Sequence, residues 1–150
     1  ELKDGRLLKY IRTNWGQLWR AFSSDGGRSW HPHGPAGIDA SSTPPFLERL
    51  SDGQIALLWN RQFPQNGEST PWRGGDGIWS ATPASNFRGE LCLSFSDDEC
   101  ESWSPPVVIA QRDEGEVCYP YLFEPEPGVF WIMAHRFGLR MRLRQEDVLR

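Results

Sequence analysis

Two arginines and a tyrosine carry the side chains best suited to binding an anion or attacking a substrate. Arg12 ends one strand-like run, Arg88 precedes another, and Tyr119 lies further along, two residues before Tyr121. A guanidinium group binds a carboxylate through two parallel hydrogen bonds and keeps its charge, a geometry that lysine lacks. A tyrosine hydroxyl has a pKa near ~10, so it needs a base to act as a nucleophile. Taken singly, each arginine is equally an ordinary strand-end residue, and each tyrosine is equally a core aromatic.

Two eight-residue segments share a pattern of serine, aspartate and tryptophan. Residues 23–30 fit Ser-x-Asp-x-Gly-x-Ser/Thr-Trp at every fixed position, and residues 96–103 fit it except that Cys100 replaces the glycine. The pattern residues are Ser23, Asp25, Gly27 and Trp30 in the first segment and Ser96, Asp98 and Trp103 in the second. Side-chain oxygens at this spacing accept backbone N–H groups, and glycine adopts the positive φ of a tight turn. We expect two structural turns, each with its tryptophan packed at the seam beside the next sheet.

A longer repeat contains these turns. Residues 2–7 recur as residues 50–55, and each copy has an Asp-Gly turn followed by an apolar run, which is a hairpin signal. A looser third copy lies at 126–130. A polar stretch rich in glycine and proline, at about 61–88, lengthens the second copy and predicts a long loop. Without that loop the unit has about 48 residues, close to the ~40 to 50 of a four-stranded propeller blade.

The composition and the apolar patterns predict an all-β fold. Gly 15 and Pro 12 in 150 residues leave little room for long helices. Hydrophobic residues make up 38% of the chain and aromatic residues 13%, enough for a packed core. Strands are expected at 6–12, 17–23, 54–60, 91–96, 107–110, 121–124, 129–135 and 139–144. In the last of these, arginine alternates with leucine or methionine, as in a half-buried strand.

Charge and apolar run length exclude two classes of partner. The net charge is −4 with acidic and basic residues interspersed, so we expect no nucleic-acid partner. The longest apolar run covers residues 129–134, far short of the ~18 to 20 residues of a membrane span. The first five residues contain neither an initiator methionine nor an apolar signal core, so we expect a piece of a larger protein.

Cysteine and histidine give no metal-binding pattern. The three cysteines lack the paired short spacings of a zinc site, so we expect small buried residues. His31 and His33 follow the first serine-aspartate turn and are expected as solvated loop residues rather than as metal ligands.

The two serine-aspartate segments resemble the Asp-box, or BNR, repeats of the sialidase (neuraminidase) superfamily. The resemblance implies a six-bladed β-propeller, of which residues 1–150 would form about half, or about three blades with a long loop near 61–88. Other propellers also carry Asp-boxes, so the boxes alone do not imply a sialidase.

Three further matches to sialidases imply site residues. Arg12 stands where sialidases place one of three arginines that bind the substrate carboxylate. Arg88 precedes its Asp-box in a spacing similar to that of a second such arginine. Tyr119 begins a stretch similar to the one that carries the nucleophilic tyrosine, with Pro120 where the family has serine. The loop at 62–87 would line the mouth of the site.

This resemblance implies a retaining exo-glycosidase that removes a terminal sialic acid or a related acidic sugar. A neutral tyrosine avoids the repulsion that a carboxylate nucleophile would meet beside the sugar's carboxylate. The family's Arg-Ile-Pro segment, acidic aspartate and activating glutamate have no match in the chain, so we expect them upstream. No cofactor or metal is implied, and the partner is a glycan. Two alternatives stay open: a sugar-binding propeller without catalysis, and a structural Asp-box propeller.

Overall fold

The computed structural model describes residues 1–67, 72–78, 81–134 and 138–149 as an all-β chain that falls into two compact units. The first unit comprises Glu1–Thr43 and Gln62–Phe87, and the second comprises Pro44–Arg61 and Arg88–Arg150. Helix is restricted, in the described part, to α1 (Gln145–Val148). No helix among these residues has the length and apolar character needed to cross a membrane.

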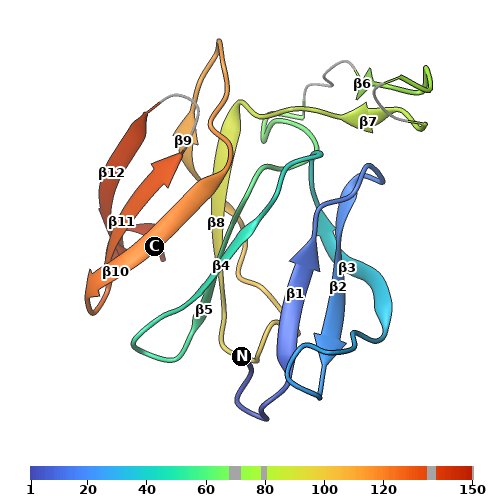
Figure 1. Cartoon of the computed structure of the whole chain (residues 1–150). Coiled ribbons are helices and arrows are strands. Elements are labelled where there is room, and N and C mark those ends of the chain that lie inside the picture. The colour runs from blue at the N-terminus through green and yellow to red at the C-terminus, as the bar shows by residue number, and fades with distance from the viewer. Residues whose placement is uncertain (68–71, 79–80, 135–137, 150) are drawn as a thin grey trace. The chain divides into compact units, whose positions relative to one another are not determined.

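The first unit is built on a three-stranded antiparallel meander. The strands β1 (Leu7–Ile11), β2 (Gln17–Ser23) and β3 (His33–Asp39) pair in the order β1-β2-β3, drawn from blue to cyan in Figure 1. The turn before β1 is closed by Asp4, whose carboxylate accepts the Arg6 backbone N–H at 3.0 Å. Gly5 adopts a φ of +85° in this turn, which favours glycine over any other residue.

The second unit contains two antiparallel sheets. The strands β4 (Phe46–Arg49), β5 (Ile55–Trp59), β8 (Glu90–Ser96) and β9 (Val107–Gln111) pair in the order β4-β5-β8-β9. The strands β10 (Pro120–Glu126), β11 (Val129–Ala134) and β12 (Leu139–Arg144) pair in the order β10-β11-β12. The two sheets share one hydrophobic core, in which the Phe95 and Phe130 rings lie 6.0 Å apart.

The sheet of β10, β11 and β12 carries large apolar side chains on both faces. Its inner face buries Leu122, Phe130 and Ile132 in the core. Its outer face carries four large side chains that remain exposed: Tyr121, Phe123, Trp131 and Met133. Successive side chains of a strand point to opposite faces of the sheet. A sheet with one solvent-exposed face therefore normally carries polar residues on that face. On this outer face the exposed Arg140 and Arg142 of β12 lie opposite Met133 and Trp131 of β11.

The described residues contain all eight strands expected from the sequence and four further strands that were not expected. Residue 135, at the end of one expected strand, lies outside the described residues. The sequence patterns did not predict β3, which contains two glycines and Pro35, or β4, which has only four residues. Both are edge strands of their sheets, where proline and short length are tolerated.

The sequence predicts a long loop at about 61–88, and most of the described residues of this stretch lie outside strands. Two short strands, β6 (Trp72–Arg73) and β7 (Ala84–Ser85), pair antiparallel within it. His33 was expected in a loop and instead begins β3, although its side chain is exposed. The three cysteines, Cys92, Cys100 and Cys118, are buried thiols, as expected.

Candidate functional site

The turn after β2 is held together by the side chains of Ser23 and Asp25. Ser23 Oγ donates to the Asp25 carboxylate at 2.7 Å and accepts the Gly27 backbone N–H at 2.8 Å. The Asp25 carboxylate also accepts the Ser29 backbone N–H at 2.9 Å and its hydroxyl at 2.6 Å. Four hydrogen bonds among polar groups of one eight-residue segment therefore hold this turn together.

The turn after β8 repeats the same hydrogen bonds. Ser96 Oγ donates to the Asp98 carboxylate at 2.9 Å and accepts the Cys100 backbone N–H at 2.9 Å. The carboxylate accepts the Ser102 backbone N–H at 2.8 Å and its hydroxyl at 2.5 Å. The replacement of glycine by Cys100 leaves this network intact.

Hydrogen bonding lowers the pKa of both aspartates, because these bonds favour the ionised carboxylate. The hydroxyl of Ser29 contributes most to the shift at Asp25, followed by the backbone of Ser29 and the hydroxyl of Ser23. The hydroxyl of Ser102 contributes most at Asp98, where the pKa falls to about 2. Both carboxylates are thus ionised at neutral pH and act as acceptors for the turns.

The two turn tryptophans are half-buried rather than deeply inserted. Trp30 folds back on its own turn, because its indole N–H donates to the Gly27 carbonyl at 3.0 Å. The Lys9 ammonium nitrogen lies 4.1 Å from the centre of the Trp30 ring, within the range of a cation–π interaction. The packing of Trp30 within its unit is therefore largely local. A role for Trp30 and Trp103 at a seam between sheets remains a proposal.

Arg88 is a buried cation held beside a carboxylate. Only 7% of its surface is exposed, and its Nη1 donates to Glu116 Oε2 at 3.3 Å. The thiol of Cys118 donates to the same glutamate oxygen at 3.5 Å. The Arg88 carbonyl accepts the Val117 backbone N–H at 2.7 Å, which ties the segment before β8 to the segment before β10. Burial next to Glu116 fixes the direction of the guanidinium, since a buried charge requires a partner.

Tyr119 lies against Arg88. The guanidinium carbon of Arg88 is 5.6 Å from the centre of the Tyr119 ring, and the ring is half-buried. The backbone of Tyr119 has a φ of +57°, a left-handed conformation that is rare for a residue other than glycine. Such a conformation costs free energy and concentrates at functional sites, which makes this tyrosine a candidate.

Tyr121 is placed differently. It is 56% exposed on the outer face of its sheet, where its ring centre lies 5.5 Å from that of Phe46. Of the two candidate tyrosines, the one beside a buried cation is therefore Tyr119.

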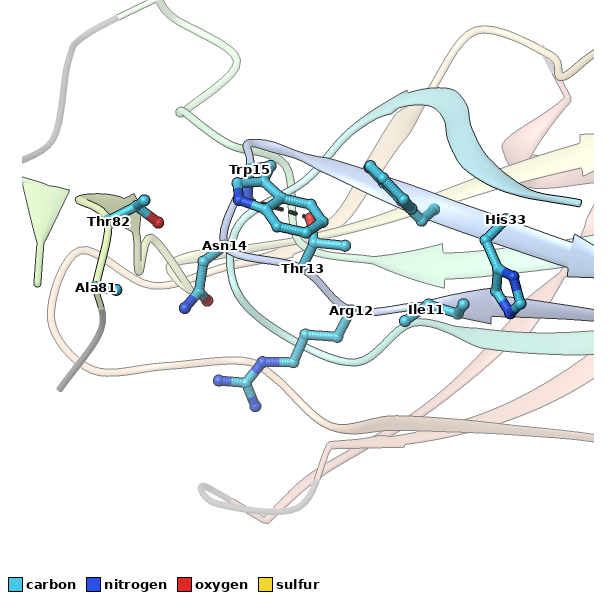
Figure 2. Close-up of a pocket in the computed structure, with 9 residues that line it drawn as sticks. Ile11, Arg12, Thr13, Asn14, Trp15, His33, Ala81 and Thr82 are labelled. Atoms are coloured by element: carbon cyan, nitrogen blue, oxygen red, sulfur yellow. Dashed lines mark hydrogen bonds between the residues drawn. The ribbon is translucent and has the colours of Figure 1, made fainter. Parts of the chain in front are cut away.

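Arg12 is an exposed residue that follows β1 directly. Its Nε donates to Ser42 Oγ at 3.1 Å, and Ser42 Oγ donates in turn to Asn14 Oδ1 at 2.6 Å. Arg12 lines a cavity of about 640 Å³ in the first unit, shown in Figure 2. Arg12 thus belongs to one unit of the chain, while Arg88 and Tyr119 belong together in the other.

The described residues offer no group of three or more histidine, cysteine or acidic side chains able to hold a metal ion.

A comparison of the sequence with family profiles tests the resemblance to BNR repeats that the two serine-aspartate turns suggest. The sequence profile of the BNR repeat-like domain matches residues 1–132. The chain belongs to the BNR repeat-like family. The resemblance to BNR repeat proteins, inferred from the two serine-aspartate segments, is therefore confirmed.

One solved structure similar to this BNR repeat-like chain is titled "Hadza microbial sialidase Hz136". The two sequences are 19% identical, with a TM-score of 0.39. The match covers 97% of the present chain and 31% of that sialidase, so the chain spans about a third of its length. No curated protein sequence gives a significant match.

The partners that fix the two arginines of this BNR repeat-like chain were not predicted from the sequence. Glu116 contacts Arg88 from 28 residues away, and Ser42 contacts Arg12 from 30 residues away. Neither partner belongs to a local motif. Glu116 is one of three carboxylates shortly before Tyr119, with Asp113 and Glu114, and the sequence does not single it out. For Ser42 there was no signal.

Proposed function

We propose that the protein is a sialidase-like, retaining exo-glycosidase that hydrolyses a terminal sialic acid or a related acidic sugar. The observation that carries this proposal is the pairing of the buried cation Arg88 with Tyr119, whose backbone is strained. An anion-binding group and a nucleophile must lie side by side to act on a sugar that bears a carboxylate at its reacting carbon. The BNR repeat-like family of the chain is compatible with this activity.

Arg88 binds the sugar's carboxylate in this proposal. Glu116 holds Nη1 of the guanidinium, so its orientation is set before the ligand arrives. Such preorganisation lowers the entropy that binding must overcome. The ion pair also leaves the guanidinium in a buried site, where charge–charge attraction is stronger than in water.

Tyr119 acts as the nucleophile. Its Oη forms a bond to the anomeric carbon as the glycosidic C–O bond breaks, the hydroxyl proton passes to a base, and an acid protonates the leaving oxygen. Water then attacks the same carbon, releases the sugar and returns the proton to Tyr119, so the configuration is retained. Residues 1–150 contain no match to the family's acid and base, so this chain supplies the nucleophile and the carboxylate-binding arginines in the proposal.

Arg12 is proposed as a second residue that binds the carboxylate. Its position after the Asp-Gly turn and the strand of the first repeat supports the assignment. Residues of the 62–87 loop are proposed to line the mouth of the site, and the support is that Ala81 and Thr82 line the same cavity as Arg12.

The architecture proposed for the complete protein is a six-bladed β-propeller, to which residues 1–150 contribute about three blades. The repeat length of about 48 residues supports this architecture. A second support is the group of four large apolar side chains exposed on the outer face of the β10-β11-β12 sheet, which a further blade would cover.

The alternative is a sugar-binding or structural Asp-box propeller without catalysis. The observation that favours it is Pro120, which replaces the serine that follows the tyrosine in the family pattern. A sugar-binding propeller would keep Arg88 as an anion-binding residue and remove the role of Tyr119, whereas a structural propeller would remove both roles.

Hydrolysis of an aryl N-acetylneuraminide by the full-length protein tests the proposal. We expect release of the aryl alcohol and, by NMR, a first sugar product of retained configuration. The matched aryl galactoside, which has no carboxylate, is expected to be inert. Binding of N-acetylneuraminic acid without turnover would support the sugar-binding alternative, and the absence of both would reject the two carbohydrate proposals.

A further inference from the structure

Asn60 is a fully buried polar residue with no role in the function proposed above. It directly follows β5 in the second unit, and 0% of its surface is exposed. An amide side chain is seldom buried so deeply unless it forms hydrogen bonds, because its removal from water costs free energy. The pairing of β5 with β8 ends at Trp59 and Cys92. Asn60 therefore stands where the backbone ladder between these two strands stops.

The amide of Asn60 donates two buried hydrogen bonds to the backbone of other segments. Its Nδ2 donates to the Glu90 carbonyl at 2.7 Å and to the Val117 carbonyl at 2.8 Å. Glu90 is the first residue of β8, and Val117 lies in the segment before β10. These acceptors are 30 and 57 residues away from Asn60 along the chain. One side chain thus joins the end of β5 to the segments that precede and begin the two following sheet strands of this unit.

Val117 is held through both of its backbone polar groups. Its N–H donates to the Arg88 carbonyl at 2.7 Å, and its carbonyl accepts the bond from Asn60. Its side chain is buried in the hydrophobic core of the unit. Tyr119, with its left-handed backbone, follows two residues later. The segment that leads into Tyr119 is therefore fixed by the backbone of Arg88 on one side and by the side chain of Asn60 on the other.

The oxygen of the Asn60 side chain shows that this amide is costly to bury. No described residue donates a hydrogen bond to Asn60 Oδ1, although this atom is buried. A buried acceptor without a partner costs free energy, which the two donated bonds offset. Departures from the rules of stable packing are expected chiefly at functional sites, and this one lies beside the segment of Tyr119.

We propose that Asn60 is a positioning residue that sets the distance between Arg88 and Tyr119. The inference rests on the proposed function, in which Arg88 binds the sugar's carboxylate and Tyr119 attacks the anomeric carbon. Such an attack requires the reacting atoms to lie about 3 to 3.5 Å apart, and a displacement of about 1 Å lowers the rate about 10²-fold. The effect of Asn60 passes through the backbone of Val117. It acts on kcat more than on binding, because the ion pair that orients Arg88 is formed by Glu116.

The first test compares the kinetics of Asn60→Ala and wild-type full-length protein on an aryl N-acetylneuraminide. We expect kcat to fall about 10²-fold and KM to change less than about threefold. Asn60→Ser keeps one hydroxyl donor and should lose less activity. The matched control is Ser104→Ala, which removes a hydroxyl that accepts the Phe95 backbone N–H at 3.0 Å near the other end of β8. This control should leave kcat unchanged.

Hydrogen–deuterium exchange gives a second measurement that does not depend on turnover. We expect Asn60→Ala to accelerate exchange of the amides of residues 116–122 about tenfold, while the amides of β11 exchange as in wild type. Ser104→Ala should leave exchange of residues 116–122 unchanged. If Asn60→Ala does not fold, the same two measurements on Asn60→Ser decide the inference.

The inference and the proposed function fail in different ways. An unchanged kcat in an active enzyme overturns the positioning role of Asn60. A lowered kcat accompanied by faster exchange throughout the second unit assigns Asn60 to general stability and also overturns it. Absence of turnover in wild type rejects the proposed hydrolysis, and exchange then decides the inference. Acceleration confined to residues 116–122 would support Asn60 as the residue that positions this segment, and uniform or absent acceleration would reject it.

Discussion

Cys100 occupies, in the turn after β8, the left-handed backbone conformation that Gly27 occupies in the turn after β2. Their φ angles are +70° and +89°, and the preceding residues, Glu99 and Gly26, have φ angles of +62° and +73°. The hydrogen bonds of the serine and aspartate side chains thus hold two non-glycine residues in a conformation that disfavours them. Glu99 also forms an ion pair with Arg49, in which Glu99 Oε2 lies 2.7 Å from Arg49 Nη2.

Gly27→Ala tests the cost of that conformation. We expect the free energy of unfolding to fall by about 1 to 2 kcal/mol, because an L-residue at positive φ brings Cβ close to its own backbone. Gly34→Ala is the control, since Gly34 has no atom within 4 Å of an added Cβ and no positive φ. Urea unfolding of both variants measures the difference. Equal effects of the two substitutions would contradict the strain at Gly27.

Asp98→Asn tests the pH dependence of the second turn. The pKa of Asp98 is lowered to about 2, while in the unfolded chain it is near ~3.9. The ionised carboxylate therefore contributes stability that is fully present above about pH 4 and is lost as the pH falls toward 2. We expect Asp98→Asn to be less stable at pH 7 and to lose less stability between pH 4 and 2.

The measurement for Asp98→Asn is the urea midpoint as a function of pH. Asp113→Asn, which makes the same charge change outside both turns, provides the comparison. Parallel pH profiles for wild type and Asp98→Asn would show that the hydrogen bonds of this carboxylate do not stabilise the fold.

Arg88→Lys tests the anion-binding role. The substitution keeps the charge beside Glu116 but removes the planar pair of donors that a carboxylate requires. We expect binding of N-acetylneuraminic acid to weaken at least tenfold, or by about 1.4 kcal/mol, with a small change in melting temperature. The exposed Arg112 supplies the control Arg112→Lys. Unaltered affinity in Arg88→Lys would remove Arg88 from the site.

Tyr119→Phe tests the nucleophile. The variant keeps the ring against Arg88 and lacks only the hydroxyl, so we expect kcat to fall about 10³-fold or more while the fold survives. Tyr121→Phe should retain activity, because that side chain lies on the outer face of its sheet. If Tyr121→Phe loses activity and Tyr119→Phe does not, Tyr121 rather than Tyr119 is the nucleophile. Activity retained in both would reject the tyrosine mechanism.

Removing the exposed apolar side chains from the outer face of the β10-β11-β12 sheet should improve the behaviour of the isolated chain and destabilise the full-length protein. As an isolated 150-residue chain the protein should self-associate, because Phe123 and Trp131 are exposed together. Replacing both with lysine should reduce light scattering by the isolated chain. The same double substitution should lower the melting temperature of the full-length protein, where we propose that another blade covers this face. A soluble monomeric wild-type chain with a cooperative thermal transition would contradict the first expectation.

The two turns were predictable because the hydrogen bonds made by the serine side chain and the aspartate carboxylate of each turn lie within eight residues. A serine hydroxyl and an aspartate carboxylate at fixed spacing accept backbone N–H groups of their own segment, as they do in residues 23–30 and 96–103. The strands with clear apolar runs were predictable for the same local reason. The strand β3 was not, because its glycines and proline give no propensity signal and its pairing with β2 supplies its stability.

The surroundings of the candidate site depend on contacts between distant segments. The position of Glu116 against Arg88 and the left-handed backbone of Tyr119 follow from how the segments before β8 and β10 are joined, and no local pattern encodes them. The sequence therefore predicts which residue types are candidates, whereas the structure identifies their neighbours.

The three buried thiols give the second unit a built-in probe of local opening. Cys92 lies within β8, Cys100 in the turn that follows it, and Cys118 directly before Tyr119. A buried thiol reacts with an alkylating reagent only when its surroundings open, so its labelling rate under native conditions measures the free energy of that opening. Separate rates at the three positions would show whether the strand, the turn and the segment beside Arg88 open together or one at a time.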